Sequence, residues 1–347
     1  MRASVTVSAI VGAAVLLAGC GGDEPGSDAA PLGQGGMAGG SGAAGQGGAG
    51  GTGGSAGNQP PTLGGCAVFT ADDEWNRDIS TAPVDAQWTA NVLALAGDIQ
   101  LHPDFGNWGG EQYGIPINVV GQSQAAVPVV FDSYPDESDP GPYPLPEPSQ
   151  AKIEGGDPYS CAGDCHLLVV QQGACKLYEG FACEYQSDGW HCGNGAVWDL
   201  TKLSYGQRPL GWTSADAAGL PIAAGLVRYD EVAADDVRHA IRFTMRCTRS
   251  VYVKPATHYA VPGDCPNSEA HPPMGLRVRL KASFDITPYP PSARAILKAM
   301  KRYGMILADN GSDFFFQAEA HEGWGEDVQE LKQVPVSAFE VIAPAEP

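Results

Sequence analysis

The sequence predicts a mainly β protein, a decorated antiparallel β-sandwich or jelly roll with a few short helices and several disulfide bonds. Several segments alternate apolar and polar residues, which is the pattern of half-buried strands. Turn-forming residues separate these segments, and the repeated strand–helix units that build parallel sheets are not found. Eight cysteines follow residue 65, an even number that suits a domain stapled by disulfides.

The expected elements follow from local patterns along the chain. A short helix is predicted at residues 86–97, and two strands are predicted around the Gly173 turn. In the strand predicted at residues 276–286, every second residue from Leu276 to Phe284 is apolar, so the residues between them line the opposite face. Half-buried strands are also predicted at residues 239–246 and 251–254.

The clearest helix is predicted near the C-terminus. Ser292 can cap it, apolar residues recur on one face, and Gly304 ends it. A hairpin is predicted next, with its tight turn at Asn310-Gly311. A shorter helix is predicted at residues 326–333.

The first twenty residues have the pattern of an export signal. Arg2 gives a positive start, residues 5–18 form an apolar stretch too short for a comfortable membrane span, and Leu17–Cys20 reads Leu-Ala-Gly-Cys. This motif resembles the lipobox of bacterial lipoproteins. The resemblance implies that residues 1–19 are a lipoprotein signal peptide and that Cys20 is lipidated. An ordinary secretory signal is the alternative.

The lipoprotein resemblance also implies a location. Acyl chains on Cys20 would make the membrane a partner and place the protein in the cell envelope. In that family an Asp after the lipidated cysteine signals inner-membrane retention, and this chain has Gly21. The outer membrane is therefore expected, with the protein facing outward or lying in the periplasm.

A flexible tether is predicted between the anchor and the folded part. Residues 21–65 contain 19 of the 46 glycines and almost no large apolar side chain, so they cannot bury enough surface to offset the entropy of ordering. We expect residues 20–65 to hold a single β-rich globular domain, residues 66–347, away from the membrane.

Spacing suggests how some cysteines pair. Cys183 with Cys192 and Cys247 with Cys265 are the favoured disulfides because each pair is close in the sequence. Cys161, Cys165 and His166 lie close together in the sequence, so a structural zinc site is the alternative to a disulfide at this cluster. No second cluster at zinc-site spacing accompanies it, so disulfides are preferred and no metal is expected there.

The charge of the chain is uneven. The total is −20, yet residues 228–302 hold 13 of the 20 Lys and Arg against seven Asp and Glu. On the polar faces of their strands these cations would form a basic stripe that binds an anionic ligand. The alternative is that acidic loops fold over the stripe and neutralise it. The expected substrate-binding residues are Arg228, Arg242, Arg277, Arg279 and Lys281.

Several side chains are candidates for acid–base chemistry. Asp164 and His166 would share a face if their segment is extended, and could then act as a pair. Asp216 lies in a Gly- and Pro-framed loop, and His239 begins a predicted strand. For any one histidine, a hydrogen bond to a backbone carbonyl is the simpler interpretation.

A calcium site is a weaker hypothesis. Asp132, Asp136 and Asp139 cluster in a turn-rich segment with hard oxygen donors. Their spacing is not that of an EF-hand loop, so a solvated acidic loop is preferred and no cofactor is expected otherwise.

Three segments resemble a family of exported bacterial proteins of unassigned function. They are residues 211–231, 272–286 and 303–312, and the resemblance extends over most of residues 98–342. It implies a shared domain and assigns no catalytic residue.

The expected function is that of a surface-anchored carbohydrate-active enzyme. No nucleophile elbow, zinc-protease motif, P-loop or dinucleotide fingerprint occurs, so nucleotides are not expected partners, and the net charge would repel nucleic acid. The remaining possibility is acid–base catalysis by Asp/Glu or His/Tyr side chains. The enzyme would be a hydrolase or a lyase, and its substrate an extracellular polysaccharide, either neutral or acidic. The alternative is a non-catalytic glycan-binding or envelope-organising lipoprotein.

Overall fold

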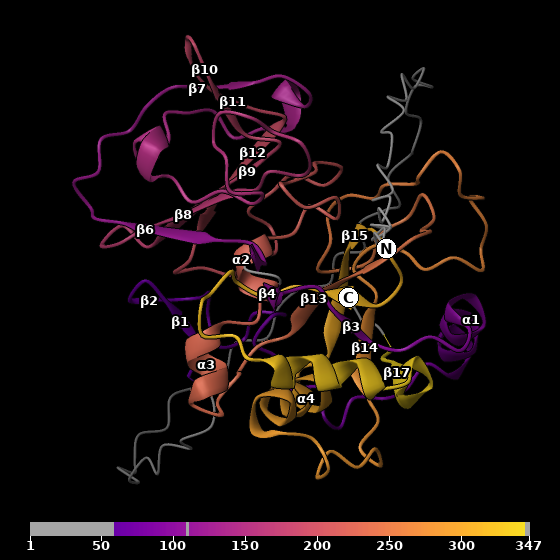
Figure 1. Cartoon of the computed structure of the whole chain (residues 1–347). Helices are drawn as coiled ribbons and strands as arrows, with labels where there is room; N and C mark the ends of the chain where they lie inside the picture. Colours follow the sequence, from indigo (N-terminus) through magenta and orange to yellow (C-terminus); the bar gives the residue numbers. More distant parts are fainter. Residues whose placement is uncertain (1–58, 109–110, 344–347) are drawn as a thin grey trace, which may run out of the picture. The chain divides into compact units, whose positions relative to one another are not determined.

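The computed structural model describes residues 59–108 and 111–343, and over these residues the chain is mainly β (Figure 1). The predicted fold class is thus confirmed. The predicted signal peptide, Cys20 and most of the predicted tether lie outside the described residues.

The larger sheet has six strands and belongs to the C-terminal half of the chain, apart from one edge strand. Its order is β17 (Phe339–Val341), β14 (Arg277–Leu280), β15 (Met305–Asn310), β13 (Ile241–Met245), β16 (Phe315–Phe316) and β3 (His102–Pro103). Strand β13 is parallel to β15 and antiparallel to β16, so the sheet is mixed rather than purely antiparallel.

The second sheet has four strands, in the order β12 (Asn194–Asp199), β9 (Lys176–Phe181), β8 (Leu167–Gln171) and β6 (Ile117–Val120). Strands β8 and β9 pair antiparallel around Gly173, as predicted. Strand β6 is parallel to β8. Smaller sheets are formed by β10 (Glu184–Gln186), β11 (Gly189–Cys192) and β7 (Val129–Phe131), by β1 (Thr62–Leu63) and β2 (Cys66–Ala67), and by β4 (Gly106–Trp108) and β5 (Glu111–Tyr113).

Two local predictions are wrong. Strands β15 and β16 do not form a hairpin with each other, because the turn after Asn310 carries the chain across β13 and the two strands pair with its opposite edges. Residues 251–254 form no strand, since only Tyr252 makes an isolated bridge, to Met274. The strand predicted at 276–286 is confined to Arg277–Leu280.

The predicted helices are present, with adjusted ends. Helix α1 (Ala86–Ala96) is capped by the Asp85 side chain, and α4 (Pro291–Arg302) begins after Pro290 without the predicted Ser292 cap. The segment predicted as a helix at 326–333 is the 3-10 helix η3 (Glu326–Gln333). The short elements are α2 (Ile222–Gly225), α3 (Tyr229–Ala233), η1 (Pro135–Glu137), η2 (Pro148–Gln150) and η4 (Val336–Ala338).

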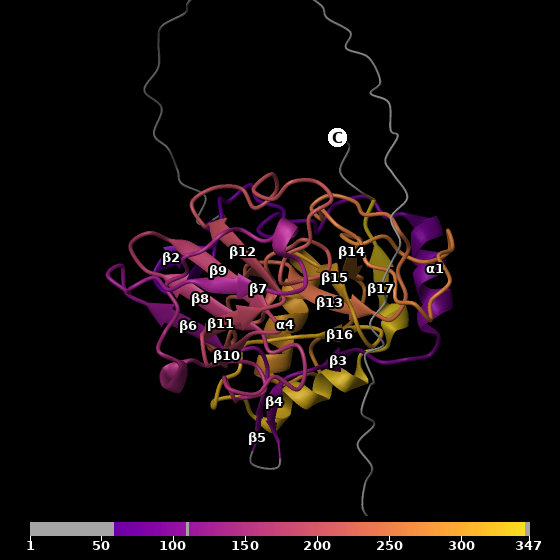
Figure 2. The same cartoon turned by 90° about the horizontal axis from the view of Figure 1, so that it is seen from above.

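One apolar core joins the two larger sheets. Leu168 and Leu177 of the four-stranded sheet belong to the same buried cluster as Phe243 and Leu307 of the six-stranded sheet. The apolar face of α4 also packs into it, through Ile296 and its neighbours. Both views show the two sheets beside each other, and in Figure 2 α4 is seen in projection between them. The seam between the two sheets positions the candidate site.

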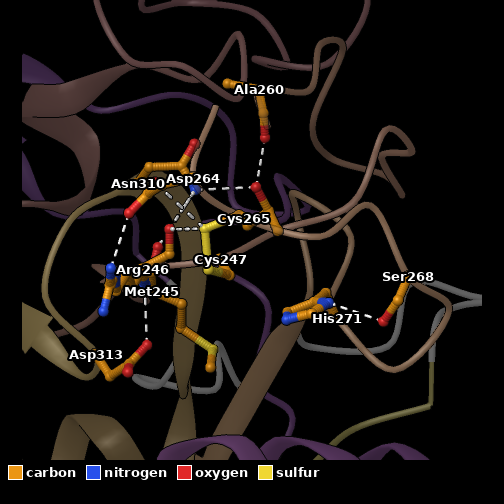
Figure 3. The surroundings of a disulfide bond; sticks show 11 residues. Met245, Arg246, Cys247, Ala260, Asp264, Cys265, Ser268, His271, Asn310 and Asp313 are labelled. Carbon is orange, nitrogen blue, oxygen red and sulfur yellow. Dashed lines mark hydrogen bonds and ion pairs between the residues drawn. A yellow bond between two sulfur atoms is a disulfide. The ribbon is translucent and has the colours of Figure 1, made fainter. Parts of the chain in front are cut away.

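Four disulfides staple the described residues. Cys183–Cys192 and Cys247–Cys265 form as predicted. The other two bonds are Cys66–Cys175 and Cys161–Cys165. Figure 3 shows the Cys247–Cys265 bond next to Arg246, whose carbonyl lies 3.5 Å from the Cys265 sulfur.

Candidate functional site

A group of polar side chains, most of them ionisable, lies where the two larger sheets meet. We name it the seam cluster, and its members share hydrogen bonds or electrostatic contact with one another. They are Glu154, His166, Asp216, Arg242, Asp309 and Gln317. Asp164 lies within electrostatic range of His166 and Asp309.

Arg242, on β13, is the centre of the cluster. Its Nε and Nη2 donate to the two carboxylate oxygens of Asp216 at 2.9 and 2.6 Å, a two-pronged ion pair that is fully buried. Its Nη1 donates to Gln317, and Nη2 lies 3.7 Å from an Asp309 oxygen. Burial alone would lower the pKa of Arg242, but Asp216, Asp309 and Glu154 outweigh that effect and raise it. Arg242 is therefore a fixed positive charge.

The loop that carries Asp216 is held by its own polar groups. The Ser214 hydroxyl accepts from the Asp216 backbone N–H at 3.0 Å and donates to the Leu220 carbonyl at 2.6 Å. Gly219 has φ of +69°, and a Cβ there would lie 2.1 Å from the Thr257 hydroxyl. The loop is thus an ordered support that fixes Asp216 against Arg242.

Asp309, at the end of β15, is the member that sequence reasoning missed. Its side chain is 26% exposed. Burial and the neighbouring Asp216 carboxylate raise the pKa of Asp309 well above its usual range, against the opposing effect of Arg242. Asp309 thus holds its proton to a higher pH than an ordinary aspartate. In the sequence it lies beside an Asn-Gly pair, which indicated only a turn.

His166 is paired with Glu154 rather than with Asp164. Its Nδ1 lies 2.6 Å from a Glu154 oxygen and its Nε2 lies 3.2 Å from the Ala215 carbonyl. Burial alone would lower the pKa of His166, but the Glu154 carboxylate outweighs it and raises the pKa to about 9. His166 is therefore an imidazolium at neutral pH that donates from both nitrogens.

The predicted Asp164–His166 pair fails for a backbone reason. Cys165, between them, has φ of +44°, so the segment is bent and the two side chains do not share a face. Asp164 is exposed, and its carbonyl accepts from Ala182 at 2.7 Å.

A hollow of about 750 Å³ opens beside Glu154, and we name it the Glu154 hollow. Glu154 is 31% exposed, and burial, which would raise its pKa, is outweighed by His166, which lowers it. Asp104, Glu111 and Lys152 also line the hollow, so carboxylates outnumber cations there. Tyr113 lines it as well and is 47% exposed.

His239 and Arg228 lie in a separate buried network. Both contact Glu231, at 3.0 Å from His239 Nε2 and 2.5 Å from Arg228 Nη2. Burial alone would raise the pKa of Glu231, but Arg228 and His239 lower it to about 2. His239 Nδ1 contacts the Ala240 carbonyl at 2.8 Å. This network fixes the start of β13.

The other predicted substrate-binding residues are engaged within the chain. Arg277 donates to the Tyr303 carbonyl and pairs with Glu74, while Arg279 pairs with Glu340. Lys281 donates to the Ser337 carbonyl at 2.8 Å. The basic stripe is thus compensated internally, which is the alternative that the sequence left open.

The residues considered as alternative calcium ligands and zinc donors have other contacts. Asp132 pairs with His191 at 2.9 Å, and Asp139 pairs with Arg208 at 2.7 Å. Asp136 is exposed in η1. The two cysteines of the predicted zinc motif, Cys161 and Cys165, are bonded to each other. Among the residues that the structure describes, no group of His, Cys, Asp or Glu is placed to hold a metal ion.

Comparison with family models, with curated proteins and with solved structures found no match to this chain. The resemblances noted in the sequence therefore stay predictions. Within residues 59–108 and 111–343, no helix is both long and apolar enough to cross a membrane.

Proposed function

We propose that the protein is a glycoside hydrolase and that the seam cluster is its active site. One observation carries the proposal: two partly exposed carboxyl groups, Asp309 and Glu154, lie around one guanidinium and have opposite pKa shifts. Glycoside hydrolysis needs a protonated and an ionised carboxyl group at one site.

The shifts assign a role to each group. Asp309 holds its proton to a higher pH than an ordinary aspartate and would donate it to the glycosidic oxygen as the leaving group departs. Glu154 stays ionised and would either deprotonate a water that attacks the anomeric carbon, or attack that carbon itself and form a glycosyl-enzyme that water then hydrolyses. Asp216 is fully buried, so it would act as a positioning residue through Arg242.

The hollow favours a neutral or amino-sugar substrate. Carboxylates outnumber cations along the Glu154 hollow, so an acidic polysaccharide would meet repulsion there. Arg242, which a lyase would need to neutralise a uronate, is committed to Asp216. Tyr113 offers an exposed ring against which a sugar can pack.

The test is a panel of neutral, amino-sugar and uronic polysaccharides incubated with the purified protein. We expect new reducing ends from a neutral or amino-sugar polymer, without the absorbance near 235 nm that an unsaturated uronate gives. Absorbance together with reducing ends would identify a lyase instead. Binding without cleavage of any polymer would support the non-catalytic glycan-binding alternative.

We also propose that Cys20 anchors the protein to the cell envelope. The support is the Leu-Ala-Gly-Cys motif and the glycine-rich residues 21–65 that follow. Labelling cells with a radioactive or clickable palmitate should mark the wild-type protein and leave Cys20→Ser unmarked. Equal labelling of the two would refute the anchor.

A further inference from the structure

We infer that a second hollow, next to the Glu154 hollow, is a binding site for a neutral polymeric glycan. This inference rests on the proposed function, because it supplies a second contact for the same class of substrate. The hollow has a volume of about 630 Å³ and is lined by Asp98, His102, Arg246, Asp313, Phe315 and Lys332, among others. We name it the His102 hollow.

A stacked pair of rings forms one wall of this hollow. The His102 and Phe315 rings lie parallel, with centroids 3.8 Å apart, and both residues are half-buried. Their strands, β3 and β16, pair at the edge of the six-stranded sheet, which fixes the rings in register. Rigid aromatic surface with polar groups around it is the usual lining of a small-molecule or sugar site.

The charges of the hollow favour a neutral ligand. Asp98 and Asp313 offset Arg246 and Lys332. Burial, followed by the nearby Lys332, lowers the pKa of His102, so its ring is uncharged at neutral pH. The formal charges therefore cancel, whereas the carboxylates and cations still offer acceptors and donors to sugar hydroxyls.

The rim of the hollow is braced. Figure 3 shows Arg246 held between two acidic residues: its backbone N–H donates to Asp313 at 2.9 Å and its Nη2 donates to Asp264 at 2.8 Å. The Cys247–Cys265 disulfide joins the residue that follows Arg246 to the residue that follows Asp264. The Arg246 side chain is 69% exposed and reaches the solvent side of the hollow.

The two hollows are neighbours along one strand end. His102 lines the second hollow and Asp104, two residues on, lines the Glu154 hollow. Asp104 lies within electrostatic range of His102. A glycan chain long enough to cross this segment would contact both hollows, so the inferred substrate is a polymer.

The experiment measures retention of the purified protein in native gels that contain a soluble neutral polymer: glucan, mannan or xylan. We expect His102→Ala to be retained about three- to tenfold more weakly than the wild-type protein, which is the effect of losing one aromatic contact. Tyr159→Ala removes another exposed ring, one that packs on Tyr185, and should bind like the wild-type protein. Thermal unfolding of each variant checks its fold.

The outcomes separate this inference from the proposed function. Equal retention of His102→Ala and Tyr159→Ala, or no retention of the wild-type protein by any polymer, overturns the inference. Cleavage of a polymer with retention that does not depend on His102 overturns the second site and leaves the hydrolase. Retention that depends on His102 without any cleavage supports the second site and refutes the hydrolase.

Discussion

His166, which is buried, and Glu154, which is partly exposed, form a contact of 2.6 Å in which each partner favours the charged form of the other. At the residue scale, such pairs decide how the site responds to pH. His166 has a folded pKa of about 9, above its unfolded value. Its contribution to stability is therefore complete below about pH 6.5 and is lost as the pH rises through about 9.

A pH-dependent unfolding experiment tests this pair. Between pH 7 and 10 the unfolding free energy of the wild-type protein should fall by about 2–3 kcal/mol through His166, an order-of-magnitude figure from the shift. In Glu154→Gln the carboxylate is gone, so the slope should flatten. Urea unfolding at both pH values measures each difference. Equal slopes in the two proteins would contradict the assignment.

Part of this site could be predicted at the residue scale. Asp216 was a candidate because it lies in a Gly- and Pro-framed loop, and Arg242 because it lies on the polar face of a predicted strand. The fold brings the two together. Asp309 was missed because the Asn-Gly pair beside it indicated a turn. Glu154 could not be predicted as the partner of His166, because the positive φ of Cys165 that turns His166 away from Asp164 leaves no local signal.

Strand β13 shows what is decided at the scale of elements. All five of its residues are buried, and β15 and β16 pair with its two edges. Alternating patterns located β13 and β14, and the Gly173 turn located the β8–β9 pair, but alternation carries no information on strand order or direction. The mixed sheet and the failed hairpin therefore could not be foreseen from periodicity.

The connection from α4 to β15 depends on one glycine. Gly304 has φ of +72°, and a Cβ there would lie 2.3 Å from the Val278 carbonyl oxygen on β14. Gly304→Ala should lower the unfolding free energy by about 2–4 kcal/mol, through the left-handed backbone and the clash. Gly121→Ala is the control, because a Cβ at Gly121 meets nothing within 4 Å. Similar losses in urea unfolding for both variants would contradict this explanation.

At the scale of the whole molecule, disulfides and charge balance hold the chain together. Cys66–Cys175 closes a separation of 109 residues, whereas Cys161–Cys165 closes only four. The even number of cysteines predicted a domain stapled by disulfides, and short spacing predicted two of the bonds. The Cys66–Cys175 bond could not be predicted, because it joins segments that only the fold brings together. The internal pairing of the basic stripe likewise depends on contacts distant in sequence, such as Arg279 with Glu340.

The length of the loop that each disulfide closes predicts how much the Cys66–Cys175 and Cys161–Cys165 bonds stabilise the protein. Replacing Cys66 and Cys175 by serine should cost about 5 kcal/mol of unfolding free energy, and replacing Cys161 and Cys165 about 2 kcal/mol, by loop-closure entropy. Guanidinium unfolding of the two double variants measures the ranking. A larger loss from the Cys161 and Cys165 pair would contradict it.

The central claim is that Asp309 acts as the proton donor of a glycoside hydrolase. The most direct measurement is the rate at which Asp309→Asn cleaves the glycan that the wild-type protein cleaves fastest, with thermal unfolding as the check of its fold. Asp235→Asn is the matched control, because Asp235 is exposed and pairs with Lys298 on the surface, outside the seam cluster. The account predicts a loss of at least about 100-fold for Asp309→Asn and none for the control. A rate for Asp309→Asn equal to that of the control would contradict it.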